Sequence, residues 1–279
     1  MLTRLARTAR AISAVTRNPP FVPPGHFYSP LTSPADAARA TQQTGGAAGV
    51  DLREQAQLAF FRDLLPLHPP PGPRYQAANR MFGPADAAVY RAVLRAVQPR
   101  QVVEAGSGYS TAVLLDEADA FPPLASTRAT CLEPHPQRLL GLMRGRDRDR
   151  LTLLRQPVQD APSAVFSALE PGDILFIDST HVVKPGSDVV HLFLQVLPSL
   201  PAGVIVHVHD VFWPFTYPAT WLTEHRDWTE TFLVHAFLLG NTQWEVTLFT
   251  SWLWACHPEL VPDGLRVAAP GSLWLRKTA

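Results

Sequence analysis

Short apolar runs alternate with segments of helical periodicity from about residue 85 onwards. The runs ILFI (174–177) and VIVHV (204–208) are nearly continuous in apolar residues, as in parallel strands covered on both faces. Between such runs, apolar positions recur at helical spacing, as they do at Val89, Val93 and Val97. This alternation predicts a doubly wound α/β domain with a mostly parallel sheet.

The pattern places the expected elements along the chain as follows. Strands are expected at 101–105, 129–133, 151–155, 173–178, 203–209, 244–250 and 272–276. Helices are expected at 85–97, from 109, and at 135–144, 161–169, 187–198 and 229–239. No segment of clear helical pattern joins the last two strands, so an antiparallel strand at the edge of the sheet fits this ending.

Proline dominates the N-terminal part of the chain. It clusters in residues 18–35 and again in 66–75, which excludes a regular helix or a central strand from both segments. We expect the first to be an extended arm and the second a linker, with a helix over 50–65 between them. The chain then divides into an N-terminal arm and helical cap, residues 1–84, and a main domain, residues 85–279.

The beginning of the chain is basic. It contains Arg4, Arg7, Arg10 and Arg17, and no acidic residue precedes Asp36. Residues 1–16 fit a short amphipathic helix of the kind found in transit peptides and surface anchors. They equally fit a frayed terminal arm, and the sequence leaves both interpretations open.

Composition narrows the classes of partner. Lys plus Arg and Asp plus Glu both total 24, so the net charge at pH 7 is zero and no global basic field favours nucleic acid. No apolar stretch reaches the roughly 18 residues that a membrane span needs. Cys131 and Cys256 make neither a disulfide framework nor a zinc knuckle, which is typical of a cytoplasmic protein with reduced thiols. We expect a small-molecule substrate, and a homo-oligomer remains possible.

The first expected strand runs into a glycine-containing turn, Glu104-Ala-Gly-Ser-Gly-Tyr-Ser-Thr111, which opens a helix. Strand, turn and helix in this order are the context that a nucleotide-binding turn requires. Thr111 occupies the third glycine position of the dinucleotide fingerprint, which argues against a nicotinamide oxidoreductase. A carboxylate at Glu104 suits a ligand that carries an ammonium group and would repel a pyrophosphate.

The run Glu-x-Gly-x-Gly-x-Ser after a strand resembles the first motif of class I S-adenosylmethionine-dependent methyltransferases, which have a Rossmann-like fold. The resemblance implies that S-adenosyl-L-methionine is the cofactor. It assigns cofactor contacts to the motif residues Glu104, Gly106, Ser107, Gly108 and Ser110. A non-methylating or partner protein of the same fold, cofactor-binding without turnover or hydroxylase-like, is the alternative.

Two further cofactor contacts are expected downstream. Glu133 ends the second strand, where an acid accepts hydrogen bonds from ribose hydroxyls in nucleotide-binding doubly wound folds. Resemblance to the family places the adenine in the loop after the third strand, where Gln159 or Asp160 is available. Asp160 is equally placed to cap the next helix.

The fourth and fifth strands end in Asp178-Ser-Thr-His181 and His207-Val-His209-Asp210. Ligands of open α/β sheets lie beyond the carboxyl ends of the strands, so we expect these acids and histidines to converge, with Asp178 near the cofactor. His207 and His209 share one face of the strand and Asp210 is at its tip, so we expect His207 to be a core residue or one that supports the site from behind, not a catalytic group. We expect His181 to be the general base that takes a hydroxyl proton, with His209 and Asp210 as rivals.

The two strand ends resemble a branch of small-molecule O-methyltransferases distantly related to catechol O-methyltransferase. In catechol-type enzymes, two strand-end acids and an adjacent Asn bind a divalent cation. Asp178 and Asp210 match the acids, but Val211 stands in place of the Asn and cannot bind a hard cation. A divalent metal is therefore doubtful, although His181 or His209 offers nitrogen to a softer metal.

Aromatic residues are the candidates for the acceptor pocket. We expect a wall from the residues after the fifth strand, Phe212, Trp213, Phe215, Tyr217 and Trp221, or alternatively a lid packed on the core. From the N-terminal cap, we expect Tyr75, Asn79 and Phe82 to close the pocket. The predicted reaction is in-line transfer of a methyl group to a hydroxyl oxygen.

Overall fold

The computed structural model describes residues 19–23, 25–42, 46–224, 226–266 and 268–279. The chain forms two compact units. The smaller comprises Met1–Thr44 and Pro218–Asp227, and the larger comprises Gly45–Tyr217 and Trp228–Ala279. Residues 45–84 thus group with the sheet, while the boundary expected at residue 84 stays a prediction. The basic segment 1–16 lies outside the described residues.

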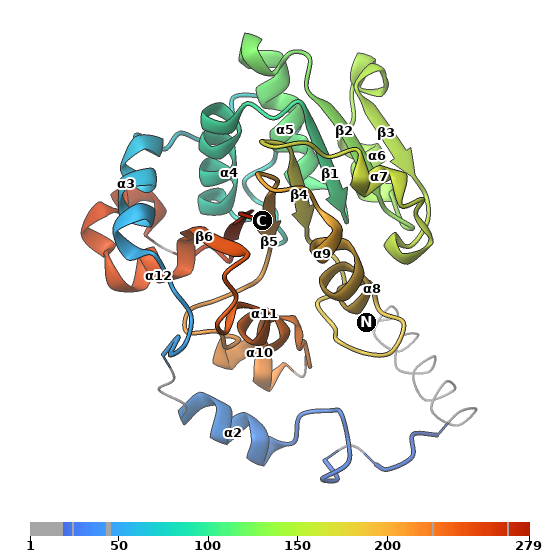
Figure 1. Cartoon of the computed structure of the whole chain (residues 1–279), viewed down its shortest axis with the longest axis vertical. Helices are drawn as coiled ribbons and strands as arrows, with labels where there is room; N and C mark the ends of the chain where they lie inside the picture. The colour runs from blue at the N-terminus through green and yellow to red at the C-terminus, as the bar shows by residue number, and fades with distance from the viewer. Residues whose placement is uncertain (1–18, 24, 43–45, 225, 267) are drawn as a thin grey trace. The chain divides into compact units, whose positions relative to one another are not determined.

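The larger unit is built on a seven-stranded sheet with the order β3-β2-β1-β4-β5-β7-β6 (Figure 1). The strands are β1 Gln101–Ala105, β2 Arg128–Leu132, β3 Leu151–Leu154, β4 Ile174–Ile177, β5 Ile205–Val208, β6 Trp244–Phe249 and β7 Leu273–Lys277. Neighbours from β3 to β5 are parallel, whereas β7 is antiparallel to both β5 and β6. The doubly wound, mostly parallel sheet is confirmed, and its antiparallel strand lies one place in from the edge.

Helices cover both faces of this sheet. The predicted helices appear as α3 Glu54–Leu64, α4 Pro84–Val97, α5 Tyr109–Ala120, α6 Gln137–Leu142, α7 Ala164–Ser167, α8 Asp188–His191, α9 Leu197–Ser199 and α11 Glu230–Leu238. A π-helical turn, Leu192–Val196, joins α8 to α9. On one face, α5 packs between α4 and α6. On the other, the ring of Phe193 contacts Phe237 of α11, whose ring contacts Trp244 of β6.

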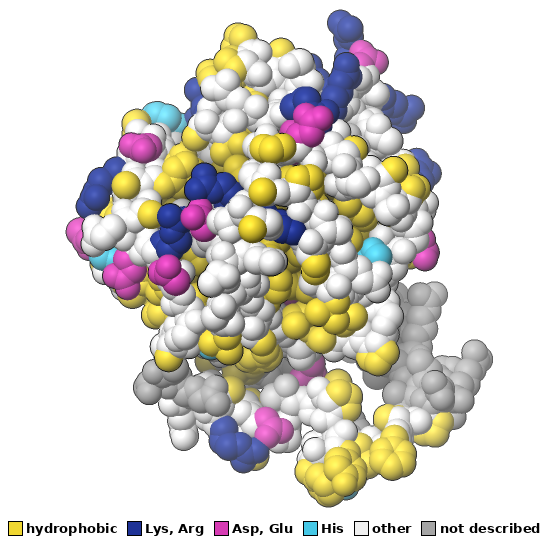
Figure 2. Space-filling view, in the orientation of Figure 1, with side chains coloured by type: hydrophobic (Ala, Val, Ile, Leu, Met, Phe, Trp, Pro, Cys, Tyr) yellow, Lys and Arg dark blue, Asp and Glu magenta, His cyan; other side chains and the backbone are white. Residues whose placement is uncertain are grey.

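The structure differs from the expected elements in its short helices. Three helices were not predicted: α2 Pro34–Gln42, α10 Ala219–Thr223 and α12 Thr250–Cys256. The helix expected at 50–65 begins only after Arg53, whose backbone is left-handed with φ of 51°. No helix within the described residues has the length and apolarity required to cross a membrane. Basic and acidic side chains are mixed over the visible face of the larger unit (Figure 2), in keeping with the zero net charge.

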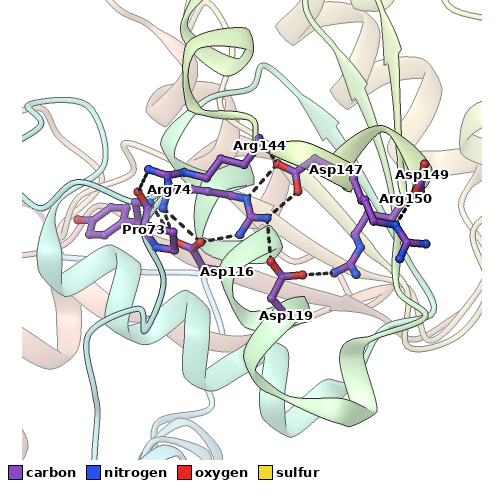
Figure 3. Close-up of polar contacts among 10 residues, drawn as sticks. Pro73, Arg74, Asp116, Asp119, Arg144, Asp147, Asp149 and Arg150 are labelled. Atoms are coloured by element: carbon purple, nitrogen blue, oxygen red, sulfur yellow. Dashed lines mark hydrogen bonds and ion pairs between the residues drawn. The ribbon is translucent and has the colours of Figure 1, made fainter.

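The linker 66–75 contains neither helix nor strand and is held by Arg74 (Figure 3). The guanidinium donates hydrogen bonds to Asp116 (2.9 Å) and Asp147 (2.9 and 2.7 Å), which are both buried, and pairs with Asp119 at 2.7 Å. Gly72 permits this approach, because a Cβ there would lie 2.1 Å from Oδ1 of Asp116. Arg74 therefore ties the linker to α5 and to the turn before β3.

The segment that follows the linker is fixed by hydrogen bonds of its own. The hydroxyl of Tyr75 and the amide of Asn79 both donate to the carbonyl of Phe82 at 2.9 Å. The backbone N–H groups of Met81 and Phe82 donate to Oδ1 of Asn79. Tyr75, Asn79 and Phe82 thus form a compact turn, which presents Met81 to the cavity described next.

Candidate active site

A cavity of about 550 Å³ opens at the carboxyl ends of β1, β2, β4 and β5. Its lining comes from the larger unit alone. Seven of the predicted site residues contribute to it: Gly106, Ser107, Glu133, Gln159, Asp178, His181 and Asp210. The expectation that these strand ends converge on one site agrees with this geometry.

Gly106 brings β1 and β4 together at the floor of the cavity. Its backbone has φ of 89°, and a Cβ at this position would lie 1.8 Å from the carbonyl oxygen of Asp178. Its N–H donates to the carbonyl of Leu132 at the end of β2. Any side chain here would push the loop after β4 away, so the glycine is required by the close packing of three strand ends.

The expected contact of Glu104 with the cofactor's ammonium group is not supported by the structure. Its carboxyl is fully buried, hydrogen-bonded to Thr111 and Cys131, and is not part of the cavity lining. Burial raises the pKa of Glu104 to about 7, against an ordinary value of 4.5. The reason lies in strand alternation, because Glu104 points to the same covered face of the sheet as Val102.

Glu133 joins the two loops that flank the cavity. Its Oε2 accepts the N–H of Ser107 at 3.2 Å, and its Oε1 accepts the N–H of His135 at 2.7 Å. Each carboxylate oxygen has a further lone pair. The side chain therefore lines the cavity in a fixed orientation and keeps acceptor capacity for two hydroxyl groups.

Of the remaining predicted cofactor-binding residues, one lines the cavity and the others do not. Gln159 lines the cavity, and its amide donates to the carbonyl of Gly186 at 2.8 Å. Asp160, Gly108 and Ser110 are not part of the lining, so the direct cofactor contacts expected of them are not supported. Asp160 ends a 3₁₀ turn with its carbonyl bonded to Gln156, and Ser110 is buried in the first turn of α5.

His181 lies at the centre of three carboxylates. Its Nδ1 is 2.8 Å from Oε2 of Glu230, while its Nε2 is 3.4 Å from Oδ1 of Asp178 and 3.6 Å from Oδ2 of Asp210. Burial by itself lowers the pKa of His181, but the bonds to Asp178 and Glu230 outweigh burial and leave the pKa well above its ordinary value. The neutral imidazole that a general base requires is therefore disfavoured in this arrangement.

Two other histidines lie behind the cavity. His209 is buried against the ring of Phe82, with Nε2 3.7 Å from Oδ1 of Asp210, and it is not part of the lining. His207 is fully buried between the rings of Phe176 and Trp274, which confirms it as a core residue. Burial and the neighbouring His209 hold the pKa of His207 well below its ordinary value.

The expected aromatic wall is not found in the lining. Phe215 stacks on His235 at 4.5 Å between centroids and contacts Phe249, and Tyr217 is likewise buried. Phe212 and Trp213 do not line the cavity either, and Trp221 belongs to the smaller unit. The alternative of a lid packed on the core therefore holds for Phe215 and Tyr217.

Several cavity residues were not predicted. They are Met81, Arg138, Lys184, Asp188 and Trp228. Glu230 was not predicted either; it is not part of the lining but is hydrogen-bonded to His181. The ring of Trp228 packs on that of His181, with centroids 4.4 Å apart. Glu230 and Trp228 come from the region of α11, 49 and 47 residues after His181, and no local sequence signal connects them with it.

The hydroxyls of Ser107 and Ser179 are buried at this cavity without a hydrogen-bond partner in the described structure. Buried hydroxyls are usually bonded, so a missing partner points to a ligand or to water. The two serines follow β1 and β4, which are neighbours in the sheet. They mark the middle of the cavity as polar and suited to a bound molecule.

Comparison with known proteins finds a family model that matches part of the chain. Residues 103–211 match the family model described as "Methyltransferase domain". An uncharacterized protein of Archaeoglobus fulgidus is 29% identical over 166 residues, which cover 53% of this chain and 73% of that protein.

Solved structures are similar at lower identity. An SAH-bound methyltransferase of Podospora anserina is 14% identical, covering 87% of this chain and 94% of that one, with a TM-score of 0.44. A 1,6-didemethyltoxoflavin-N1-methyltransferase of Burkholderia thailandensis is 17% identical, covering 90% and 93%, with a TM-score of 0.39. Likenesses at this distance say nothing of the substrate. Residues 103–211, which run from β1 to just beyond β5, therefore match a methyltransferase domain.

Proposed function

We propose that this enzyme transfers the methyl group of S-adenosylmethionine to a hydroxyl oxygen of a small molecule in the cavity at the carboxyl ends of β1, β2, β4 and β5. The observation that carries the proposal is the distance between the acid at one end of the cavity and the two acids at the other end. Glu133 follows β2, whereas Asp178 and Asp210 follow β4 and β5. From β2 to β5 there are three strand spacings, about 14 Å, enough for a nucleoside at one end and a reacting centre at the other.

The lining fits the polar groups of the cofactor. The free lone pairs of Glu133 suit the two ribose hydroxyls, and the unpartnered hydroxyls of Ser107 and Ser179 suit the amino-acid part. Gln159 lies in the loop after β3 and suits the adenine. Arg138 packs against the glycine turn, since a Cβ at Gly108 would lie only 2.9 Å from its Cδ. Its guanidinium suits the carboxylate of the cofactor's amino-acid part.

The second end of the cavity supports chemistry on a hydroxyl group. In the proposed reaction the acceptor oxygen attacks the methyl carbon, the carbon–sulfur bond breaks, and S-adenosylhomocysteine leaves. The hydroxyl proton must pass to a base. Asp210 lines the cavity, and His181 faces its carboxylate, so we assign the proton to Asp210 and a positioning role to His181. His209 stands behind Asp210, with Nε2 3.7 Å from Oδ1 of that carboxylate.

The experiment has two stages. Calorimetry with S-adenosylhomocysteine tests the cofactor site, for which we expect a dissociation constant in the micromolar range, roughly −8 kcal/mol. Transfer from methyl-labelled S-adenosylmethionine to a panel of small phenols, alcohols and amines then tests the acceptor. Labelling of amines alone would overturn the hydroxyl acceptor. Cofactor binding without transfer to any acceptor would favour a non-methylating role, and binding of NAD in place of S-adenosylhomocysteine would overturn the proposal altogether.

A further inference from the structure

The metal site that the catechol-type resemblance implies does not fit this chain. That site needs an amide oxygen beside the second strand-end acid, where this chain has Val211. The Val211 side chain is fully buried, and its backbone N–H is bonded to the carbonyl of Gly271 at 3.0 Å. No oxygen is available from this residue's side chain, so an all-oxygen magnesium site cannot form in the expected way.

A different set of donor atoms is brought together instead. We infer that Asp178, His181 and Asp210 bind a divalent transition-metal ion, of the zinc type, through two carboxylate oxygens and Nε2 of the imidazole. One ligand atom from each residue can be chosen so that all three lie within 4.8 Å of one another. All three side chains line the same cavity.

The two distances from the histidine nitrogen to the carboxylates match a small tetrahedral ion. Zinc bonds to nitrogen and oxygen are about 2.0–2.2 Å long, so neighbouring ligands of a tetrahedral site lie about 3.4 Å apart. Nε2 of His181 is 3.4 Å from Oδ1 of Asp178 and 3.6 Å from Oδ2 of Asp210. Three protein ligands would leave a fourth position open for a substrate or water, as in zinc sites that act on a substrate.

His181 is held in the orientation that this site needs. Oε2 of Glu230 lies 2.8 Å from Nδ1, so a hydrogen on Nδ1 is bonded. Nε2 faces the two aspartates, and a bound ion would replace its proton. The backbone N–H groups of Thr229 and Glu230 both donate to the carbonyl of His181, at 2.9 and 3.0 Å. A carboxylate behind a ligating histidine is the usual arrangement at metal sites, where it fixes the ring and its tautomer.

The donor set also selects the metal. Magnesium prefers oxygen ligands in octahedral geometry, whereas an imidazole nitrogen with two carboxylates suits zinc and cobalt. Such an ion would supply positive charge and an open coordination position beside the acceptor end of the cavity. This inference concerns the cavity of the proposed function but rests on the three side chains alone, so metal binding and methyl transfer can fail separately.

The test measures metal binding directly on the full chain. Purified protein is stripped with chelator and dialysed against zinc, cobalt or magnesium, and bound metal is counted, with cobalt also followed by its visible spectrum. We expect one equivalent of zinc or cobalt per chain and a tetrahedral cobalt spectrum. Magnesium should bind far more weakly.

Three variants make the assignment specific. His181→Gln should abolish the cobalt spectrum, and Glu230→Gln should weaken zinc binding by about 10- to 100-fold, as loss of an outer partner does. His135→Ala removes an exposed histidine that is not among the three proposed ligands and should leave zinc binding unchanged. Binding of S-adenosylhomocysteine by each variant shows that the fold is intact. Equal zinc binding by His181→Gln, tighter binding of magnesium than of zinc, or no bound metal at all would each overturn the inference.

Discussion

The hydroxyl of Thr111 donates a hydrogen bond to the buried carboxyl of Glu104 and accepts the N–H of Gly108 at 3.1 Å. Thr111, which stands where a dinucleotide-binding turn has its third glycine, therefore stabilises this turn. It links the first strand to the start of α5 and sets the shape of the turn from inside. Glu104 is thus tied to the glycine turn through Thr111 and is not part of the cavity lining.

The first prediction follows from the raised pKa of Glu104. Burial raises the pKa of this carboxyl from 4.5 to about 7. The unfolded chain then releases the proton near pH 4.5 and the folded chain near pH 7, so stability falls as the pH rises between these values. A shift of 2.5 units, from 7 − 4.5, corresponds to about 3 kcal/mol, a penalty that is complete above pH 7.

Glu104→Gln should remove this penalty. Urea unfolding at pH 5 and pH 8 measures it as the difference in unfolding free energy between the variant and the wild type. The variant should gain stability over the wild type at pH 8 by up to about 3 kcal/mol and gain little at pH 5. Glu259→Gln, at an exposed position, should show no such dependence. An equal difference at both pH values would show that the folded carboxyl titrates normally.

The fold could be predicted from sequence because each parallel strand is buried on both faces. β4, for example, is buried at all four positions, and a short run of apolar residues is the direct expression of that burial. The short helices α10 and α12 were missed because five and seven residues carry too little periodicity. For α3, the left-handed Arg53 moved the start of the helix in a way that no propensity shows.

The site could be predicted only in part. Glu133, Asp178 and Asp210 were found because strand ends meet at one edge of a parallel sheet. Glu104 was assigned to the cofactor from the motif, whereas the structure buries its carboxyl against Thr111 and Cys131. Glu230 and Trp228 could not be found, because only the tertiary packing of α11 brings them to His181.

A second prediction tests Glu133 as the ribose acceptor. Glu133→Ala should weaken binding of S-adenosylhomocysteine by about 1.5–3 kcal/mol, the value of hydrogen bonds to a charged group. Calorimetry measures this as a dissociation constant raised roughly 10- to 150-fold. Asp160→Asn alters an acid outside the lining and should leave binding unchanged. Unchanged binding in Glu133→Ala would remove this residue from the cofactor site.

A third prediction concerns magnesium. Because Val211 offers no ligand oxygen, we expect activity to have no strict requirement for this ion. After exhaustive treatment with EDTA and its removal, added magnesium should leave turnover where it was. Zinc or cobalt should raise turnover if the reaction uses a metal ion bound by Asp178, His181 and Asp210. Complete loss that magnesium alone restores would show this expectation to be wrong.

A fourth prediction concerns the arginine that holds the linker. Arg74→Ala leaves Asp116 and Asp147 buried without their cation, which typically costs about 3–5 kcal/mol. Arg146→Ala breaks a pair whose arginine side chain is 94% exposed and should cost less than about 1 kcal/mol. Denaturant unfolding of both variants gives the comparison. Similar small losses would mean that the linker contributes little to the stability of the larger unit.

The last prediction separates the histidines at the reacting end of the cavity. His181 lies in the lining and faces Asp210, whereas His209 is buried behind Asp210. His181→Ala should lower kcat by up to about 10²–10⁴, the usual contribution of general-base catalysis, because Asp210 then loses the group that positions it. Cofactor affinity should stay within a few-fold, because the ribose and adenine contacts lie at the other end of the cavity.

His209→Ala is the matched control and should lower kcat much less. Both variants are assayed for kcat and for S-adenosylhomocysteine binding, once an acceptor has been found. If His209→Ala alone reproduces the large loss, the proton passes through the end of β5 and His181 is structural. If neither variant loses activity while Asp210→Asn does, the carboxylate accepts the proton without help from either ring, and alignment of the acceptor with the methyl group accounts for the remaining rate.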